Sequence, residues 1–181
     1  MSDAAPRLRL ASAADLPRLR ELIPASVRGL APGYYTPGQI ESSIVHMFGP
    51  DSQLIADGTY FAVECDGALA ACGGWSRRKT LFGGDQHKSA EDPLLDPSVD
   101  AARIRAFFVH PAFARRGLGS LLLRACMDAA RAAGFRKLAL VATLPGEPLY
   151  LAFGFQARER FDAPLADGTS LPVVAMERAL P

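Results

Sequence analysis

The sequence predicts a mixed α/β fold, in which a twisted and mostly antiparallel sheet of about seven strands carries helices on both faces. Two observations predict it. Segments with β-type alternation and segments with helical periodicity follow one another in the order βααβββαβαββ. Tight-turn dipeptides at Asp66-Gly67 and Asp167-Gly168 predict antiparallel hairpins on either side of one strand-helix-strand unit. Because such a unit joins parallel strands, the sheet must be mixed.

The N-terminal part of the chain predicts one strand followed by two helices. Residues 7–11 alternate between charged and apolar side chains, as in a strand. Ser12 followed by Asp15 is typical of a helix N-terminus, and leucines at helical spacing come after it. Thr36 and Pro37 are typical of the start of a second helix, because proline suits the first helical turn.

A hairpin and a long loop form the middle of the chain. Residues 59–65 and 68–75 favour two strands joined by a tight turn. Residues 80–100 contain two glycines, two prolines and five acidic residues, which predicts an exposed loop. Because loops of this length are uncommon in compact domains, we expect it to be functional.

The C-terminal half contains the strand-helix-strand unit and the second hairpin. Its first strand ends at His110-Pro111, and the following helix is closed by Gly134. The predicted elements are a strand at 103–109, a helix at about 117–133, a strand at 137–142, a short helix near 147–153, and strands at about 155–162 and 169–178.

Length and composition favour one soluble domain over residues 1–181. The chain is 49% hydrophobic and carries 20 Lys+Arg against 19 Asp+Glu, a formal net charge of +1. This composition excludes wholesale disorder and a general basic excess for nucleic-acid binding. No stretch approaches the roughly 18 consecutive apolar residues of a membrane helix, and the N-terminus lacks the apolar core of a signal peptide. We therefore expect neither nucleic acid nor a membrane as a partner.

Cysteine and histidine usage predicts a reducing compartment and no metal. Cys65, Cys72 and Cys126 are widely spaced, and no Cys-x-x-Cys pair occurs in the sequence. The three histidines add no metal-ligand spacing. We therefore expect a cytoplasmic protein without a metal cofactor.

The strongest functional signal lies between residues 107 and 123, where a strand leads through a proline-bounded turn into glycines that open a helix. A helix start has about four unpaired N–H groups, and glycines let an anion approach them closely. Residues 101–140 also carry eight Arg or Lys against one acid, a local net charge of +7, although most of these arginines can equally be solvated surface charges. We predict a cradle for a polyphosphate such as a nucleotide or coenzyme A. Its residues are Arg115, Arg116, Gly117, Leu118, Gly119 and Ser120.

Two other glycine motifs fit this segment poorly. The phosphate loop of nucleoside triphosphatases needs GxxxxGK[ST], and no Lys-Ser or Lys-Thr follows the glycines. The dinucleotide fingerprint needs GxGxxG, and Leu122 replaces its third glycine. A nucleotide-binding function is therefore the weakest of the alternatives.

The pattern resembles the GNAT superfamily of N-acetyltransferases over nearly the whole chain. The central motif of that family is a strand ending in two hydrophobic residues and Val-x-Pro, followed by [Gln/Arg]-x-x-Gly-x-[Gly/Ala] and a helix. Ala114 stands where the family has Gln or Arg, which matters little because main-chain amides bind the phosphate. A second family motif, Tyr-x-x-x-Gly-Phe, recurs downstream. The matching residues are Phe107, Phe108, Val109, Pro111, Gly117 and Gly119, and then Tyr150, Gly154 and Phe155.

The resemblance implies a GNAT-like acyl-CoA N-acyltransferase fold and a site for acetyl-CoA. It implies that the main chain of Phe107, Phe108 and Val109 holds the pantetheine and acyl group between two parted strands, and that residues 115–120 hold the pyrophosphate. A main-chain N–H near Val109 would stabilise the oxyanion. Tyr150 would protonate the departing thiolate, the alternative being that its ring only packs.

The general base is not evident from the sequence. Many relatives carry a Glu on the strand before Val-x-Pro, where this chain has Arg103 and Arg105. Glu64, Asp100 or Glu147 is each a candidate, and none is assigned. The two arginines suggest an acceptor with a carboxylate or phosphate, a hypothesis based on charge alone.

The sequence therefore supports an N-acetyltransferase acting from acetyl-CoA on a primary amine of a small molecule, peptide or protein. A non-catalytic module that binds or senses acyl-CoA is the alternative, because the cradle would bind without a base. The acceptor, the acyl length and the oligomeric state, a homodimer included, are not encoded in a readable pattern. Tyr34, Tyr35 and Trp75 are candidates for an acceptor pocket, with ordinary packing as the alternative.

Overall fold

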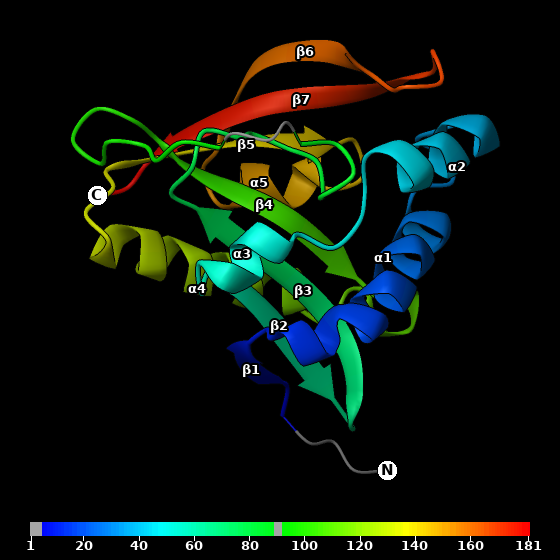
Figure 1. Ribbon diagram of the computed structural model, residues 1–181, viewed down its shortest axis with the longest axis horizontal. Coiled ribbons are helices and arrows are strands. Elements are labelled where there is room, and N and C mark those ends of the chain that lie inside the picture. The colour runs from blue at the N-terminus through cyan, green and yellow to red at the C-terminus, as the bar shows by residue number, and fades with distance from the viewer. Residues whose placement is uncertain (1–4, 89–91) are drawn as a thin grey trace.

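The computed structural model describes residues 5–88 and 92–181. In these residues seven strands form one sheet (Figure 1). The strands are β1 (Arg7–Leu10), β2 (Tyr60–Cys65), β3 (Ala68–Ser76), β4 (Ala102–Val109), β5 (Lys137–Thr143), β6 (Gln156–Pro164) and β7 (Ser170–Ala179). Their order is β1-β2-β3-β4-β5-β7-β6, and neighbours pair antiparallel except β4 and β5. This confirms the mixed, mostly antiparallel sheet predicted from the sequence.

Helices cover both faces of the sheet, as predicted. In Figure 1 the first three helices lie in front of the sheet and the fourth lies behind it. The helices are α1 (Leu16–Leu30), α2 (Pro37–His46), α3 (Ser52–Ala56), α4 (Leu118–Ala132) and α5 (Glu147–Ala152). Short 3-10 turns precede α1 (Ala13–Asp15) and α4 (Pro111–Phe113).

Separate groups of buried side chains fill the two faces. Behind the sheet, Leu123 of α4 packs with Leu140 of β5 in a cluster that also contains Tyr150 of α5. In front, Leu19 of α1 packs with Tyr60 of β2. Burying each of these side chains contributes about 1.5 to 3 kcal/mol, so the sheet is held rigidly between its helices.

Local signals in the sequence explain where the helices begin. The Thr36 hydroxyl accepts a hydrogen bond from Gln39 N at 3.2 Å, and the Gln39 side-chain oxygen accepts one from Thr36 N at 3.0 Å. This reciprocal cap confirms the predicted start of α2. Helix α3 was not predicted, because five residues are too short to show a helical period. Asp51 caps this helix by accepting a hydrogen bond from Leu54 N at 3.1 Å.

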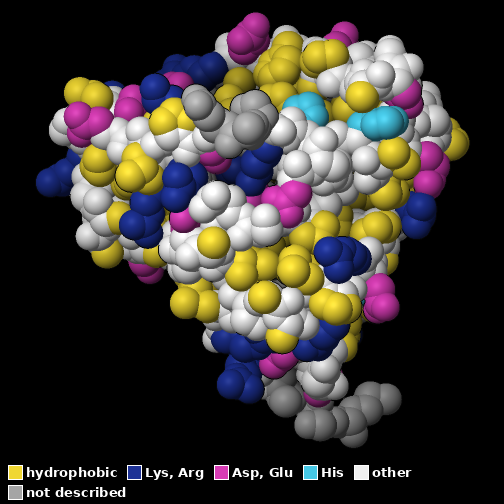
Figure 2. All heavy atoms as spheres, in the orientation of Figure 1, with side chains coloured by type: hydrophobic (Ala, Val, Ile, Leu, Met, Phe, Trp, Pro, Cys, Tyr) yellow, Lys and Arg dark blue, Asp and Glu magenta, His cyan; other side chains and the backbone are white. Residues whose placement is uncertain are grey.

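The predicted loop at 80–100 contains no helix or strand in its described residues, and 89–91 lie outside them. On the face seen in Figure 2, acidic and basic side chains are interspersed, in keeping with the net charge of +1. Within the described part of the chain, none of the helices combines the length and the apolar character that a bilayer crossing requires.

Candidate active site

Strand β4 bends at a bulge in its middle. Gly74 of β3 pairs with Arg105, whereas Cys72 pairs with Phe108, so two residues of β4 lie opposite the single residue Gly73. Ala106 has a φ of +58°, in the left-handed region that non-glycine residues rarely occupy. Gly73 makes room for the bulge, because a Cβ there would lie 2.5 Å from the ring of Phe107. Bulges of this kind often lie next to active sites and turn the following side chains.

Strands β4 and β5 are paired only at their first residues. The parallel ladder joins Ala102 to Leu138 and Arg103 to Ala139, and no later residue of either strand pairs with the other. Since β4 continues to Val109 and β5 to Thr143, the two strands part over most of their length. The facing edge of β4 therefore keeps main-chain hydrogen-bonding groups without a partner from β5.

The main-chain N–H of Val109 lies on this open edge. The next residue, His110, donates its N–H to Ala70 O of β3 at 2.8 Å. Because successive N–H groups of a strand point to opposite sides, the N–H of Val109 points away from β3. There it donates to the hydroxyl oxygen of Ser26, on α1, at 3.2 Å. The N–H expected to stabilise an oxyanion thus already has a side-chain partner, which the sequence had not indicated.

The predicted cradle is a tight turn at the start of α4. Arg115 and Gly117 both have left-handed φ values, +64° and +79°, and Gly117 is the N-cap of the helix. Among the described residues, none accepts a hydrogen bond from the main-chain N–H groups of residues 116–120. These donors and the positive end of the helix dipole favour a phosphate group.

The side chains of the cradle leave its main chain open. Arg115, Arg116 and Gly117 are exposed, and the Arg116 guanidinium lies 5.4 Å from the centre of the Phe113 ring. A Cβ at Gly119 would lie 3.0 Å from the Leu149 side chain, so a glycine allows α5 to approach this helix. The turn and α5 are thereby fixed relative to each other.

Tyr150 lies on α5 at the part of β4 that follows the bulge. Its ring centre is 6.2 Å from that of Phe107 and 5.7 Å from that of Phe155. Burial raises the pKa of the phenol well above its ordinary value, and Cys126 raises this pKa further. The hydroxyl is therefore protonated at neutral pH and able to donate. No described residue forms a hydrogen bond with it.

The structure separates the two predicted phenylalanines by face. Phe107 points to the α4 side, whereas Phe108 points to the α1 side, where its ring centre lies 5.6 Å from that of Phe48. Because main-chain groups alternate along a strand, those of Phe107 and Val109 face the open edge, whereas those of Phe108 face β3, where Phe108 lies opposite Cys72.

Arg105 is one of the two arginines on which the hypothesis of an anionic acceptor was based. Its side chain is 1% exposed and is paired with the buried carboxylate of Asp51 at 2.9 Å. It also donates to the carbonyl oxygen of Gly83, and Lys88 pairs with the same Asp51. Burial lowers the pKa of Arg105, with Asp51 opposing this effect. Arg105 anchors the 80–88 loop and is not free to bind a substrate anion.

The three candidate bases occupy different places. Glu64 accepts from Arg9 at 2.8 Å on β2, far along the sheet from β5. Asp100 accepts from the main-chain N–H of Asp96 in the loop before β4. Only Glu147 shares α5 with Tyr150, and there it is paired with Arg160 at 3.2 Å.

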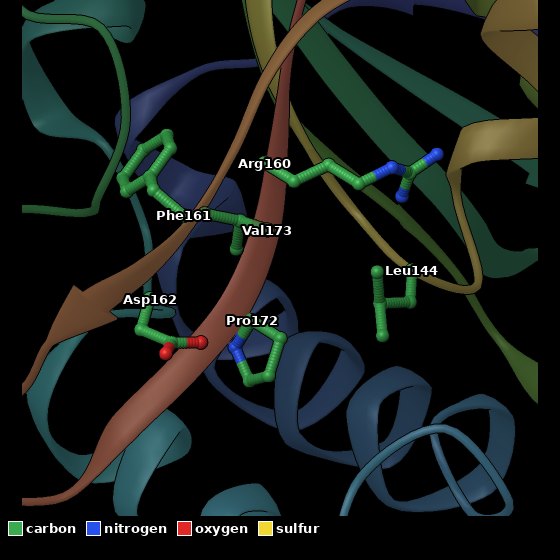
Figure 3. Close-up of a pocket in the computed structure, with 6 residues that line it drawn as sticks. All are labelled: Leu144, Arg160, Phe161, Asp162, Pro172 and Val173. Carbon is green, nitrogen blue, oxygen red and sulfur yellow. The ribbon is translucent and has the colours of Figure 1, made fainter.

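A cavity of about 200 Å³ lies where β5 ends and β7 begins, beside β6 (Figure 3). Leu144 and Arg160 extend on one side of β7 in this view, and Phe161 extends on the other. Leu144 packs both against the cluster that contains Tyr150 and against the cluster formed with α1 and α2. The cavity is lined by Leu144, Arg160, Phe161, Asp162, Pro172 and Val173.

Tyr35 fixes one wall of this cavity. Its hydroxyl donates to Pro172 O at 2.7 Å and accepts from Leu144 N at 2.9 Å. Burial raises the pKa of this phenol to about 12. Trp75 is buried against Phe135, so packing is the role that the structure shows for it, whereas Tyr34 is half exposed.

A larger hollow of about 860 Å³ lies where β4 and β5 begin, with Arg103 and Lys137 in its wall. The two strands are still hydrogen-bonded there, so this hollow does not open between them. Within residues 5–88 and 92–181, no three His, Cys, Asp or Glu side chains gather as a metal site would require.

Residues 28–155 match the sequence family described as the acetyltransferase (GNAT) family. Because this match covers more than half of the 181 residues, the chain belongs to the GNAT acetyltransferase family. The matched segment contains the bulge, the cradle and Tyr150. No curated protein sequence matches the chain.

Solved structures of N-acetyltransferases share the fold. A GCN5-related N-acetyltransferase from Rhodopseudomonas palustris is 21% identical, with a TM-score of 0.73 and 99% of both chains covered. The PaiA N-acetyltransferase from Thermoplasma acidophilum, in complex with coenzyme A, is 16% identical, with a TM-score of 0.65 and coverages of 97% and 99%. A GNAT family acetyltransferase from Brucella melitensis, in complex with acetyl-CoA, is 19% identical, with a TM-score of 0.56 and coverages of 97% and 88%.

Proposed function

We propose that residues 1–181 form one N-acetyltransferase unit that transfers the acetyl group of acetyl-CoA to a primary amine. The main observation behind this proposal is that β4 parts from β5 between two groups suited to the reaction. One is the row of unpartnered main-chain donors at 116–120, and the other is the buried phenol of Tyr150. The family membership supports the same function.

The residues fit acetyl-CoA in the manner that the sequence resemblance implies. The N–H groups of 116–120 would hold the pyrophosphate, with Arg115 and Arg116 at the surface beside it. The open edge of β4, at Phe107 and Val109, offers main-chain partners for the amides of pantetheine. When bound, the cofactor supplies an acetyl group activated as a thioester.

The reaction needs little more from the protein than positioning and proton transfer. The lone pair of a neutral amine forms the C–N bond, the C–S bond breaks, and one proton passes from the amine nitrogen to solvent while the thiolate gains one. Tyr150 is the group proposed to donate that second proton, because its ring lies 6.2 Å from that of Phe107 on β4 and its hydroxyl is protonated at neutral pH. The Val109 N–H is placed to stabilise the oxyanion.

The proposed acceptor pocket is the 200 Å³ cavity next to Leu144. Four of its lining side chains are apolar, and its two charged ones are Arg160 and Asp162. Because Leu144 also contacts the cluster with Tyr150, an amine in this cavity would lie near the parted strands. A cavity of this size suits a small amine or the end of a peptide better than a folded protein surface.

A cytoplasmic location completes the proposal. The cysteines Cys65, Cys72 and Cys126 are buried and free, which suits a reducing compartment.

The test is the release of free thiol from acetyl-CoA in the presence of a panel of amines. The panel includes small apolar amines, diamines, amino acids and short peptides. The proposal predicts amine-dependent thiol release and one N-acetylated product for each thiol. If the protein binds acetyl-CoA but releases no thiol with any member, it acts as a binding module and the enzymatic proposal is wrong.

A further inference from the structure

We propose that Ser26 is the second hydrogen-bond donor to the acyl carbonyl oxygen, beside the main-chain N–H of Val109. This inference rests on the proposed acetyltransferase function. It assigns a role to a residue of α1 that lies outside both motifs of the sequence.

The hydroxyl of Ser26 lies beside the open edge of β4. Ser26 is 5% exposed, and its Oγ lies 3.2 Å from Val109 N. That N–H points to the edge of β4 from which β5 has parted. An acyl group held on this edge would therefore bring its carbonyl oxygen next to both groups.

The hydroxyl proton of Ser26 has no acceptor among the described residues. A serine hydroxyl accepts through its lone pairs and donates one proton. Ser26 uses its oxygen as an acceptor, and no described residue accepts its proton. A buried serine in a helix commonly donates to a carbonyl three or four residues earlier, as Ser43 does to Ile40 O at 2.7 Å. Ser26 makes no such bond, so its proton is available to a ligand.

Helix α1 is packed tightly against the chain that follows β4. Gly29 follows Ser26 by three residues and so lies on the same helix face. A Cβ at Gly29 would lie 2.2 Å from Cγ of Pro111, just beyond the end of β4. The absence of that Cβ lets α1 approach closely enough for Ser26 to reach Val109.

Ser26 thus has two roles at one position. Without a ligand, its oxygen satisfies a buried N–H, which would otherwise cost about 1 to 3 kcal/mol. With acyl-CoA bound, the hydroxyl would turn aside from the Val109 N–H, so that its proton and this N–H both reach one oxygen, where negative charge develops during transfer. Donors placed in advance at such an oxygen stabilise the transition state more than the ground state.

The experiment compares Ser26→Ala and Ser26→Cys with Ser43→Ala. Ser43 is the matched control, because it is also a buried helical serine but its hydroxyl bonds only within α2. One readout is the infrared carbonyl stretch of bound acetyl-CoA labelled with ¹³C at the thioester carbon. A second is calorimetric binding of coenzyme A, which lacks the acyl oxygen, and a third is kcat for thiol release.

The proposal predicts that Ser26→Ala raises the carbonyl frequency and lowers kcat about 10²-fold, with the affinity for coenzyme A within about twofold of the wild type. Ser26→Cys keeps the side-chain volume but its thiol donates weakly, so it should also raise the carbonyl frequency and lower kcat. This variant tests the proposal even if Ser26→Ala fails to fold. Ser43→Ala should move neither.

Two results would overturn the proposal in distinguishable ways. If the wild type binds acetyl-CoA and transfers its acetyl group while the Ser26 variants keep the wild-type frequency and kcat, the role of Ser26 is wrong and the proposed function stands. If the wild type does not bind acetyl-CoA, both are wrong.

Discussion

At the residue scale, the proposed chemistry depends on the phenol of Tyr150 as the proton donor. Tyr150→Phe removes the proton and leaves the ring contacts with Phe107 and Phe155 in place. We expect kcat to fall about 10² to 10⁴-fold, because general acid catalysis is lost, with little change in coenzyme A affinity. Steady-state kinetics and calorimetry measure the two quantities.

The matched control for this prediction is Tyr60→Phe. Tyr60 is fully buried, and its hydroxyl contacts the Cys72 sulfur at 3.2 Å and the carbonyl oxygen of Ala106 in the bulge at 3.4 Å, away from α5. That variant should lose some stability and keep its kcat. A Tyr150→Phe enzyme with wild-type kcat would show that Tyr150 only packs.

A second residue-scale prediction concerns acid stability. Arg9 binds Asp15 with hydrogen bonds of 2.7 and 2.8 Å and lowers the pKa of this carboxyl to about 2. Because the folded pKa lies below the unfolded value, the contribution is fully present above about pH 4 and is lost as the pH falls through 2. After allowance for solvent screening, Asp15→Asn should lower the free energy of unfolding by about 1 to 2 kcal/mol at pH 7.

Urea unfolding of the wild type and of Asp15→Asn between pH 7 and pH 2 measures this. The difference in unfolding free energy should shrink as the pH falls below about 4. A difference that stays constant down to pH 2 would show that the pair has no linked titration.

The sequence revealed the site residues that belong to local motifs. The glycines at 117 and 119 and Tyr150 lie at fixed spacings in a strand-turn-helix and a short helix, so a pattern contains them. Ser26 and Val109 are 83 residues apart, and their contact depends on how α1 crosses the sheet. No spacing in the sequence encodes such a contact.

At the element scale, the close approach of α1 to the end of β4 is testable through Gly29. Gly29→Ala gains helix propensity of about 1 kcal/mol, but its Cβ would lie 2.2 Å from the rigid ring of Pro111. We expect the cost of overpacking to exceed this gain. The free energy of unfolding, measured by chemical denaturation, should fall by about 1 to 3 kcal/mol.

Gly38→Ala on α2 provides the control, because its Cβ would meet only Thr36 Oγ1, at 4.0 Å. This variant should be as stable as the wild type or slightly more so. Equal stability of Gly29→Ala and Gly38→Ala would contradict the close packing of α1 at Pro111.

A second prediction at this scale concerns the Asp51–Arg105 ion pair beside the 80–88 loop. Asp51→Ala leaves the buried Arg105 without its carboxylate, which should cost about 3 to 5 kcal/mol in urea unfolding. The double variant Asp51→Ala, Arg105→Leu should lose less than the two single variants together, since neither charge is then stranded. Strict additivity would contradict the ion pair.

Most elements were predictable because their signals are local. Caps, tight turns and periodicity placed seven strands and four of the five helices in the described part of the chain. The bulge of β4 was not predicted, although Gly73 and Gly74 inside a strand are a signal of close main-chain approach. The anionic-acceptor hypothesis loses Arg105, because composition cannot show that this arginine is buried against Asp51.

At the scale of the whole molecule, the sheet separates the cradle and Tyr150 from the residues beside the proposed acceptor cavity. The cradle and Tyr150 belong to the α4 face, whereas Tyr35 and Phe161 near the proposed acceptor cavity pack with α1 and α2. The parted strands β4 and β5 connect the two faces. In the proposed function, an amine would reach the thioester where β4 and β5 part.

The central claim is that main-chain donors at 116–120 hold a diphosphate beside the parted strands. Calorimetric titration of the purified protein with coenzyme A and, separately, with pantetheine tests it most directly, because pantetheine lacks the diphosphate. We predict saturable one-to-one binding of coenzyme A that is at least about tenfold tighter than that of pantetheine. No binding of coenzyme A, or equal affinity for both compounds, would contradict the account.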